Sequence, residues 1–600
     1  MVSEIARRYQ GPIHTFAPYA PASDRKGWEG LPEKLRKNLI AQGEQVIDYN
    51  YPMLPATKYM EFCRIGNRSM FEDIYFTRRR VLNALVLAEC CENKGRFLDT
   101  IINGVMAICE ESGWQLPAHN YYPGWAHLCI PDNSDPVSDL FSCETGAQLA
   151  MVSWLLKEQL DSVTPLIDER IRREVRARTV EPFLSGRHHW GWMGAPGAFV
   201  NNWTPWCTQN TLIACLSDPQ LDRATKRQLI VEAAQCLDYF LDSYGEDGCC
   251  NEGASYYRAA GLCLFNAIEV LNACTDNAFA GLYEQTKVKN IAPYIMNVHV
   301  DDRYYANFAD CAPTAGRAGA RDFLFAKRVG NEEMMRYAAI DHQADDGERT
   351  KRSENLFYRL QAAFTEAEIS SYDTSRPPVK KDIYYESVGL LIARDGHLFL
   401  AAKAGGNDDS HNHNDTGSIT VYRDGRPMLI DVGVETYSRK TFSPERYDIW
   451  TMQSQYHNVM TFGDVMQLAG HEYAAKVEDA VLEEGRAAMR MELSACYPAG
   501  TVESYQREVE FIKGKSITVT DRFSPAAEGT FLTLMTLNAP TAGDSCLQIE
   551  GQGEITFTGA GRMEVEKITI TDPKLLGEWG DTLYRTRIYP TGSELKFVIQ

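Results

Sequence analysis

The feature that most constrains the fold is a change in hydrophobic periodicity near residue 370 of the 600-residue chain. From about residue 30 to 370, apolar residues recur at helical spacing between short glycine-containing breaks. In 226–244, for example, they form a wide stripe that stops at Gly245. Such a repeated pattern of helix, short break and helix predicts stacked antiparallel helical hairpins.

Beyond a polar, proline-containing stretch at 370–378, strand signals dominate. Pairs of short apolar segments flank three turn sequences, at 394–396, 423–425 and 513–515, as in β-hairpins. A chain of this length also exceeds what one hydrophobic core usually supports. We therefore predict a multidomain α+β protein with an all-α half followed by an antiparallel β-sandwich.

The predicted domain limits follow from the same change in pattern. The helical domain is expected at 1–372, the linker at 373–382 and the sheet domain at 383–600.

Charge and composition exclude several kinds of partner. The formal net charge of −20 argues against nucleic acid or an anionic membrane as the main partner, although a local cleft can still be basic and bind a polyanion. No apolar run reaches the length of a membrane span, and the N-terminus lacks the apolar core of a signal peptide. The sixteen cysteines include no C-x-x-C pair, which indicates buried reduced thiols. We expect a cytoplasmic protein, or a periplasmic or secreted one if a leader has been removed.

One segment of the sheet half concentrates side chains that bind metals or transfer protons. His411, His413 and Asp415 alternate, so that in an extended chain they share one face. Asp431 and His457 follow within strand-rich sequence. The alternative interpretation is a polar surface turn.

Two segments of the helical half also depart from the helical pattern. The segment 187–203 combines aromatic residues, glycines, histidines and asparagines, which suits binding of sugar rings, although it is also compatible with a packed interhelical loop. The segment 247–258 starts a helix with Tyr256 and Tyr257 next to Arg258. A tyrosine there could have a lowered phenol pKa and transfer protons; alternatively, both tyrosines are packing residues.

Three motifs, in this order, resemble those of the heparinase II/III-like polysaccharide lyases, which include glycosaminoglycan and alginate lyases. The motifs are Asn201-Asn202-Trp203, Asn251-Glu252-Gly253-x-x-Tyr256 after Asp247-Gly248, and His411-x-His413-x-Asp415 followed by Asp431 and His457. The resemblance covers roughly residues 70 to 470. It implies an N-terminal (α/α) toroid of helical hairpins followed by a C-terminal antiparallel β-sandwich.

The resemblance also implies the chemistry, a β-elimination at a uronic acid. Asn201 or Asn202 corresponds to the group that neutralises the substrate carboxylate; some relatives carry a histidine where this chain has Asn202. Tyr256 corresponds to the phenol that protonates the departing O4, and it can also take the C5 proton when both lie on one ring face. His411, contributed across the domain interface, corresponds to the other proton-transfer or neutralising group. Tyr257 is the alternative to Tyr256.

The resemblance further implies one divalent metal ion, bound by His413, Asp431 and His457. Two imidazoles and a carboxylate suit Zn²⁺ better than Mn²⁺. We expect a structural ion that holds the strands so that His411 faces the cleft. The alternative is a hydrogen-bonded cluster without metal. No organic cofactor is expected.

Further residues are candidates for contacts with the substrate: His188, His189, Trp190, Trp203, Tyr257, Arg439, Arg446 and Tyr447. The guanidinium groups match the geometry of carboxylates and sulfates, although 436–447 is also compatible with a solvated loop.

We therefore predict a lyase that cleaves uronic-acid-containing glycans to unsaturated uronate products, with glycosaminoglycans such as heparan sulfate, chondroitin or hyaluronan as substrates. One alternative is a glycoside hydrolase, for which Asp247 and Glu252 supply the required carboxylic acids. A non-catalytic carbohydrate-binding protein is the other. The expected partner is an anionic polysaccharide or oligosaccharide, with neither nucleic acid nor membrane; a homo-oligomer is compatible with the sequence.

Overall fold

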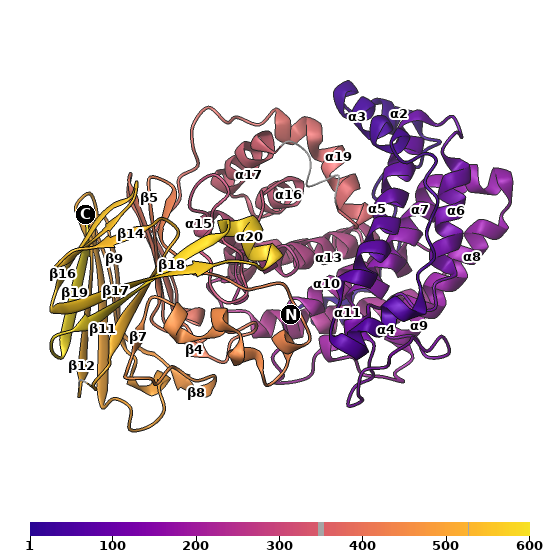
Figure 1. The fold of residues 1–600 in the computed structure, drawn as a ribbon. Coiled ribbons are helices and arrows are strands. Elements are labelled where there is room, and N and C mark those ends of the chain that lie inside the picture. Colours follow the sequence, from indigo (N-terminus) through magenta and orange to yellow (C-terminus); the bar gives the residue numbers. More distant parts are fainter. Residues whose placement is uncertain (346–352, 526) are drawn as a thin grey trace. The chain divides into compact units, whose positions relative to one another are not determined.

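The computed structural model describes residues 1–345, 353–525 and 527–600, and the chain divides into two compact units (Figure 1). Unit 1 comprises Met1–Ser243, Arg258–Ala292 and Arg317–Pro378. Unit 2 comprises Tyr244–Tyr257, Pro293–Gly316 and Val379–Gln600. The chain passes into unit 2 for the last time between Pro378 and Val379. The predicted limits of 1–372, 373–382 and 383–600 stay a prediction.

Unit 1 is built from helices that pack in neighbouring pairs. Its longer helices are α3 (Glu33–Glu44), α5 (Ser69–Glu92), α6 (Leu98–Cys109), α7 (Leu140–Val163), α8 (Leu166–Val175), α10 (Trp203–Leu216), α11 (Arg223–Ser243), α13 (Gly261–Cys274), α16 (Ala320–Val329), α17 (Glu332–Ala344) and α19 (Leu356–Ser370). Helix α10 is almost entirely buried and packs against α7, α11 and α13. The predicted helix at 226–244 is confirmed as α11.

The start of α7 shows how local sequence fixes a helix boundary. The side chain of Asp139 accepts hydrogen bonds from the backbone N–H groups of Phe141 and Ser142, and the Ser142 hydroxyl accepts from the Asp139 N–H. This capping box satisfies amides that have no partner within the helix. The same carboxylate accepts from His119 Nδ1 at 2.7 Å, which ties the preceding loop to the helix.

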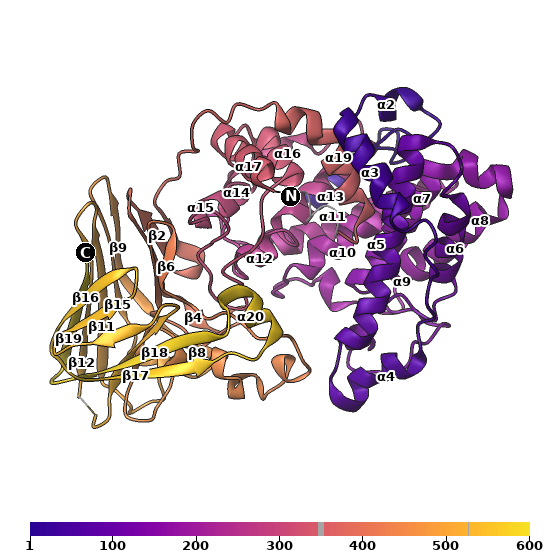
Figure 2. The ribbon, with the colours of Figure 1, turned by 45° about the horizontal axis from the view of Figure 1, so that its top comes forward.

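Unit 2 contains, among its described residues, four antiparallel sheets. One sheet has the order β1 (Ile383–Tyr385), β2 (Leu390–Arg394), β3 (Leu398–Lys403), β5 (Ile419–Arg423) and β6 (Arg426–Leu429). The largest has the order β14 (Pro540–Ala542), β15 (Cys546–Ile549), β16 (Gly553–Thr558), β19 (Glu594–Ile599), β12 (Ser516–Ser524), β11 (Ser504–Ile512), β10 (Arg486–Glu492) and β9 (Lys476–Glu483), whose central strands lie side by side in Figure 2. The others are β17 (Ala560–Thr569), β18 (Thr582–Pro590), β13 (Phe531–Thr536) and β7 (Met460–Thr461), and β4 (Gly406–Asn407) with β8 (Gly470–Ala474).

The predicted hairpins are confirmed as β2–β3, β5–β6 and β11–β12. Burial alternates along β11, as expected for a strand with one face on the core. The inward residues join a core to which both large sheets contribute, including Leu400, Val421, Val509 and Phe597. The strand half is therefore a sandwich of packed sheets.

Two segments from the helical half of the sequence pack with the sheets rather than with the helices. The first contains α12 (Ala254–Tyr257), and the second contains α15 (Tyr294–Val298). The two segments pack closely at Gly253: a Cβ atom at this position would lie only 2.6 Å from Cys311 Cβ. The φ of Gly253 is +84°, which also favours glycine. Tyr256, which we assigned to the helical half, consequently lies in unit 2.

Within the described part of the chain, no helix is both long and apolar enough to cross a membrane. The sixteen cysteines, all of which are described, are free thiols and most are buried. Their burial agrees with the prediction of buried thiols.

Candidate functional site

The predicted proton-transfer residues Tyr256 and His411 form a stacked pair within unit 2. Their ring centroids are 4.5 Å apart, and the Tyr256 hydroxyl lies 3.5 Å from His411 Nδ1. His411 lies in the loop between β4 and β5 with a φ of +58°, whereas Tyr256 belongs to the short helix α12. Both side chains are partly exposed, so a ligand can reach them.

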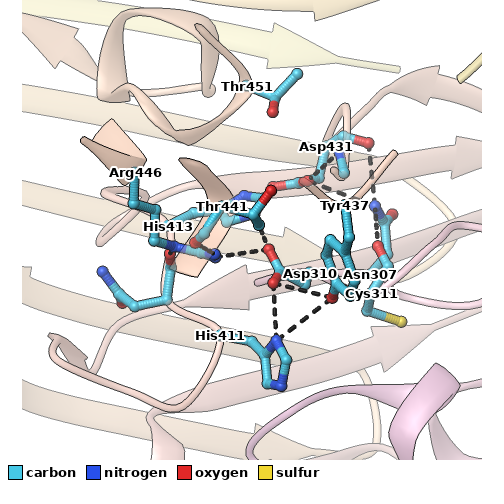
Figure 3. Close-up of polar contacts among 12 residues, drawn as sticks. Asn307, Asp310, Cys311, His411, His413, Asp431, Tyr437, Thr441, Arg446 and Thr451 are labelled. Carbon is cyan, nitrogen blue, oxygen red and sulfur yellow. Dashed lines mark hydrogen bonds and ion pairs between the residues drawn. The ribbon is translucent and has the colours of Figure 1, made fainter. Parts of the chain in front are cut away.

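A buried carboxylate, Asp310, lies at the centre of the polar contacts around His411 (Figure 3). Its Oδ2 accepts hydrogen bonds from His411 Nδ1 at 2.8 Å and from the Tyr437 hydroxyl at 3.0 Å. Its Oδ1 accepts from His413 Nε2 at 3.0 Å and from Arg446 Nη2 at 2.6 Å. The side chain of Asp310 is completely buried, which strengthens these interactions.

The contacts of the imidazole define its charge. Burial alone would lower the pKa of His411, but hydrogen bonds to Asp310 and to Glu252 raise it to about 9. Glu252 Oε2 lies 3.3 Å from His411 Nε2, so each ring nitrogen faces a carboxylate. Burial would raise the pKa of Asp310, yet hydrogen bonds from the two histidines and the charge of Arg446 hold it well below its usual range. His411 is therefore an imidazolium near neutral pH, held between two carboxylates.

The phenol of Tyr256 is neutral under the same conditions. Burial, reinforced by the negative charge of Asp310, raises the pKa of Tyr256 well above its ordinary value. Its hydroxyl makes a short hydrogen bond with the hydroxyl of Tyr437, which in turn donates to Asp310. The expectation of a lowered phenol pKa is therefore wrong, because burial and the nearby carboxylate raise it.

Tyr257, the alternative to Tyr256, has a different environment. It is completely buried and its ring packs against Tyr294 at 5.8 Å. Its surroundings are those of a core residue.

The three residues predicted to bind a metal are brought together. His413, Asp431 and His457 are all buried, and each offers a ligand atom within 4.8 Å of the others. The nitrogen Nδ1 of His413 is buried and has no hydrogen-bond partner among the residues that the structure describes. Asn307 donates to both the carbonyl and Oδ1 of Asp431. A donor set of two imidazoles and one carboxylate, with an unpaired buried nitrogen, fits a divalent cation.

The histidines predicted to bind substrate make local contacts in unit 1. His188 Nε2 lies 2.7 Å from Asp135 Oδ2, and its ring stacks on Tyr122 with centroids 4.6 Å apart. His189 Nε2 lies 2.7 Å from the carbonyl of Gly194. These contacts orient both rings.

Trp190 and the Asn201-Asn202-Trp203 motif have mixed exposure. Trp190 is buried and its indole N–H donates to the carbonyl of Pro182 at 2.9 Å, which is the packing alternative considered for this segment. Asn201 Oδ1 accepts from the Trp203 backbone N–H at the start of α10, and Asn202 is buried there. Trp203 is only partly buried and leaves ring surface available.

The three predicted anion-binding residues of the sheet unit differ from one another. Arg446 is buried: its Nε donates to the carbonyl of Asn412 and its Nη1 to that of Thr441, while Nη2 pairs with the central carboxylate described above. Through these hydrogen bonds the guanidinium holds the loop in place. The Tyr447 hydroxyl accepts from Asn412 Nδ2 at 3.1 Å. Arg439 is exposed.

The chain is thus a helical toroid followed by an antiparallel β-sandwich, as predicted, and unit 2 contains the tyrosine–histidine pair and a candidate metal site. Residues 377–574 match the family described as heparinase II/III-like, C-terminal. The match lies in the sheet half of the chain and confirms, for that half, the resemblance indicated by the motifs. No curated protein sequence is significantly similar to the chain.

Solved structures share the whole fold at low sequence identity. A crystal structure of heparinase III has a TM-score of 0.66 and 11% identity, over 100% of this chain and 89% of that one. A second heparinase III has a TM-score of 0.58 and 12% identity, over 100% and 87%. A heparan sulfate lyase from Pedobacter heparinus has a TM-score of 0.58 and 14% identity, over 100% and 86%. These likenesses confirm the predicted fold class.

Proposed function

We propose that the protein is a polysaccharide lyase that cleaves uronic-acid-containing glycans by β-elimination, with glycosaminoglycans such as heparan sulfate, chondroitin or hyaluronan as substrates. The observation that carries the proposal is the pairing of a neutral phenol, Tyr256, with a cationic imidazole, His411, in one partly exposed cluster. The similar solved structures are those of a heparinase III and a heparan sulfate lyase, which supports the same class of reaction.

The two side chains suit different steps of the elimination. The imidazole of His411, in its neutral form, takes the C5 proton, and the imidazolium that results stabilises the negative charge that develops on the uronate carboxylate. The C4–O4 bond then breaks as the C4–C5 double bond forms, and the phenol of Tyr256 donates its proton to the departing oxygen. The high pKa of Tyr256 favours this donor role over that of a base at the start of the reaction.

The remaining residue roles come from the family resemblance. Asn201 or Asn202 would neutralise the substrate carboxylate with an amide. Arg439, which is exposed, and Tyr447 would contact sulfate or carboxylate groups. Trp203 would offer its ring to a sugar.

A glycoside hydrolase is less well supported by the carboxylates in unit 2. Hydrolysis needs one protonated and one ionised carboxyl group flanking the scissile bond. The carboxylate of Asp247 accepts hydrogen bonds from the backbone N–H and hydroxyl of Ser387, both at 2.8 Å. Glu252 is buried and faces His411. Both groups hold other parts of the unit in place.

The nature of the products tests the proposal. Digestion of heparan sulfate, chondroitin sulfate or hyaluronan is expected to give oligosaccharides that absorb ultraviolet light, because elimination leaves a double bond conjugated to the carboxylate. Their masses should be one water lower than those of hydrolysis products, and oxygen-18 from labelled water should not enter the cleaved bond. Saturated, labelled products would identify a hydrolase instead.

We also propose that the metal is a structural Zn²⁺ held by His413, Asp431 and His457. When bound, it would cross-link the segments that carry these residues, and its removal should destabilise unit 2. Elemental analysis of dialysed protein is expected to give about one zinc per chain. A chelator should lower the melting temperature of the wild type but not of His457→Ala. If the dialysed protein contained no metal and a chelator left its melting temperature unchanged, the metal would be excluded and the lyase proposal would stand.

A further inference from the structure

We infer that Asp310 is a positioning residue that couples the metal-binding group to the reacting pair. One of its oxygens orients the metal-binding His413, and the other orients His411. The part concerning His411 rests on the proposed function, whereas the part concerning His413 does not.

The four contacts of Asp310 fill its capacity as an acceptor. Each oxygen accepts two hydrogen bonds, Oδ1 from His413 and Arg446, and Oδ2 from His411 and Tyr437. An ionised carboxylate has about four lone-pair sites. Rotation of the side chain would therefore break contacts on both sides at once, in a position with no solvent exposure. The carboxylate fixes the two imidazoles relative to each other.

The contact with His413 determines which of its nitrogens can bind a metal. Because Asp310 Oδ1 accepts the proton of His413 Nε2, the lone pair of that ring resides on Nδ1. This Nδ1 is the buried nitrogen for which the described part of the chain offers no hydrogen-bond partner. A carboxylate behind a ligating histidine commonly fixes its tautomer and raises its basicity toward the metal.

The segment that carries Asp310 is itself anchored to the metal-binding group. Asn307, three residues earlier, donates to the carbonyl of Asp431 at 3.1 Å and to its Oδ1 at 3.4 Å. Between them, Ala309 has a φ of +52°, a left-handed conformation that is uncommon for alanine. The segment thus adopts a strained turn that places its carboxylate between the two histidines.

Only one residue separates His411 from His413 in the sequence, and the two rings contact different oxygens of the Asp310 carboxylate. His411 has a positive φ of 58°, so its backbone is also in an unfavourable conformation. A shift of His413 on binding a metal would therefore move Asp310, and with it the ring that stacks on Tyr256. Metal binding and the orientation of His411 are coupled by this route.

Asp310→Asn tests the inference with zinc affinity as the primary measurement. The amide keeps the shape but has one acceptor oxygen, so one of the two imidazoles meets an N–H donor. Competition with a chromophoric chelator is expected to show zinc binding weakened about 10- to 100-fold. On a uronate polymer, kcat should fall while KM changes little, because the reacting ring is misoriented and no substrate contact is removed.

Asp409→Asn is the matched control. This carboxylate lies in the same loop as His411, but it pairs with Lys403 Nζ at 3.3 Å. Its loss should leave zinc affinity unchanged even if stability falls. A wild-type zinc affinity in Asp310→Asn would overturn the inference, whether or not the protein proves to be a lyase. Weakened zinc binding without any lyase activity in the wild type would instead remove the proposed function and retain the role of Asp310 toward His413.

A measurement on the wild type covers the case in which Asp310→Asn does not fold. Nitrogen-15 spectra of histidine-labelled protein titrated with Zn²⁺ are expected to show one imidazole that keeps its Nε2 proton and binds zinc through Nδ1. His413→Gln should remove that signal. Zinc binding through Nε2 of His413 would contradict the arrangement, since that nitrogen is the one facing Asp310.

Discussion

Tyr256→Phe is expected to lower kcat on a uronate polymer by about 10²- to 10⁴-fold, the usual contribution of a positioned acid or base. The substitution removes the hydroxyl but keeps the ring, which stacks on His411 at 4.5 Å. The cation beside it and its two carboxylate partners stay in place. The affinity of the Tyr256→Phe protein for substrate, measured by calorimetry, should therefore differ little from that of the wild type.

The adjacent residue supplies the control for this experiment. Tyr257→Phe removes a hydroxyl one position away, from a ring that is completely buried against Tyr294. Its activity is expected to stay within a few-fold of the wild type, because the ring is remote from solvent. If Tyr256→Phe were active and Tyr257→Phe inactive, the proton donor would be the other tyrosine, and the arrangement around His411 would need a different explanation.

The order of the two architectures could be predicted because it depends on local patterns. Helical periodicity in 226–244 and turn residues at 394–396 and 423–425 each specify structure over short distances, and the structure contains those elements. The inclusion of Tyr244–Tyr257 and Pro293–Gly316 in the sheet unit was not predictable in this way. It depends on close packing between residues far apart in sequence, such as Gly253 and Cys311.

The candidate site was only partly predictable for the same reason. His411 and His413 stand in a recognisable motif, and the metal group that includes His413 is assembled as expected. Asp310 has no motif around it; only the folded chain shows that it binds both histidines. Arg446 was a candidate for contacts with substrate anions; its burial and its pairing with a carboxylate cannot be seen in the sequence of its loop.

Tyr437 illustrates a further limit of the sequence. It is one of 30 tyrosines, and no neighbouring residue sets it apart. The structure distinguishes it by its hydrogen bonds to Tyr256 and Asp310. Its phenol pKa is raised, first by burial and then by the neighbouring phenol and carboxylate. It is therefore a neutral hydroxyl that orients the predicted proton donor.

A second large effect is expected from the buried ion pair that supports the candidate metal-binding group of His413, Asp431 and His457. Arg507 on β11 and Asp521 on β12 face each other across the ladder and are both completely buried. The guanidinium donates to both carboxylate oxygens, at 2.7 and 2.8 Å. The remaining nitrogen of the guanidinium, Nη1, donates to the carbonyls of Gly417 and Asn458. These two residues lie close in sequence to His413 and His457.

Arg507→Met is expected to destabilise unit 2 by about 3–5 kcal/mol, because it leaves the carboxylate of Asp521 buried without its charge partner. Urea unfolding measures this loss of stability. The transition of unit 2 is recognised as the one that a chelator shifts. The double variant Arg507→Met/Asp521→Leu removes the stranded charge and should recover part of the stability. It cannot recover all of it, since the carbonyls of Gly417 and Asn458 still lack their donor. Equal destabilisation of the single and double variants would mean that these carbonyl contacts, rather than the ion pair, hold the metal-binding segments to the sheet.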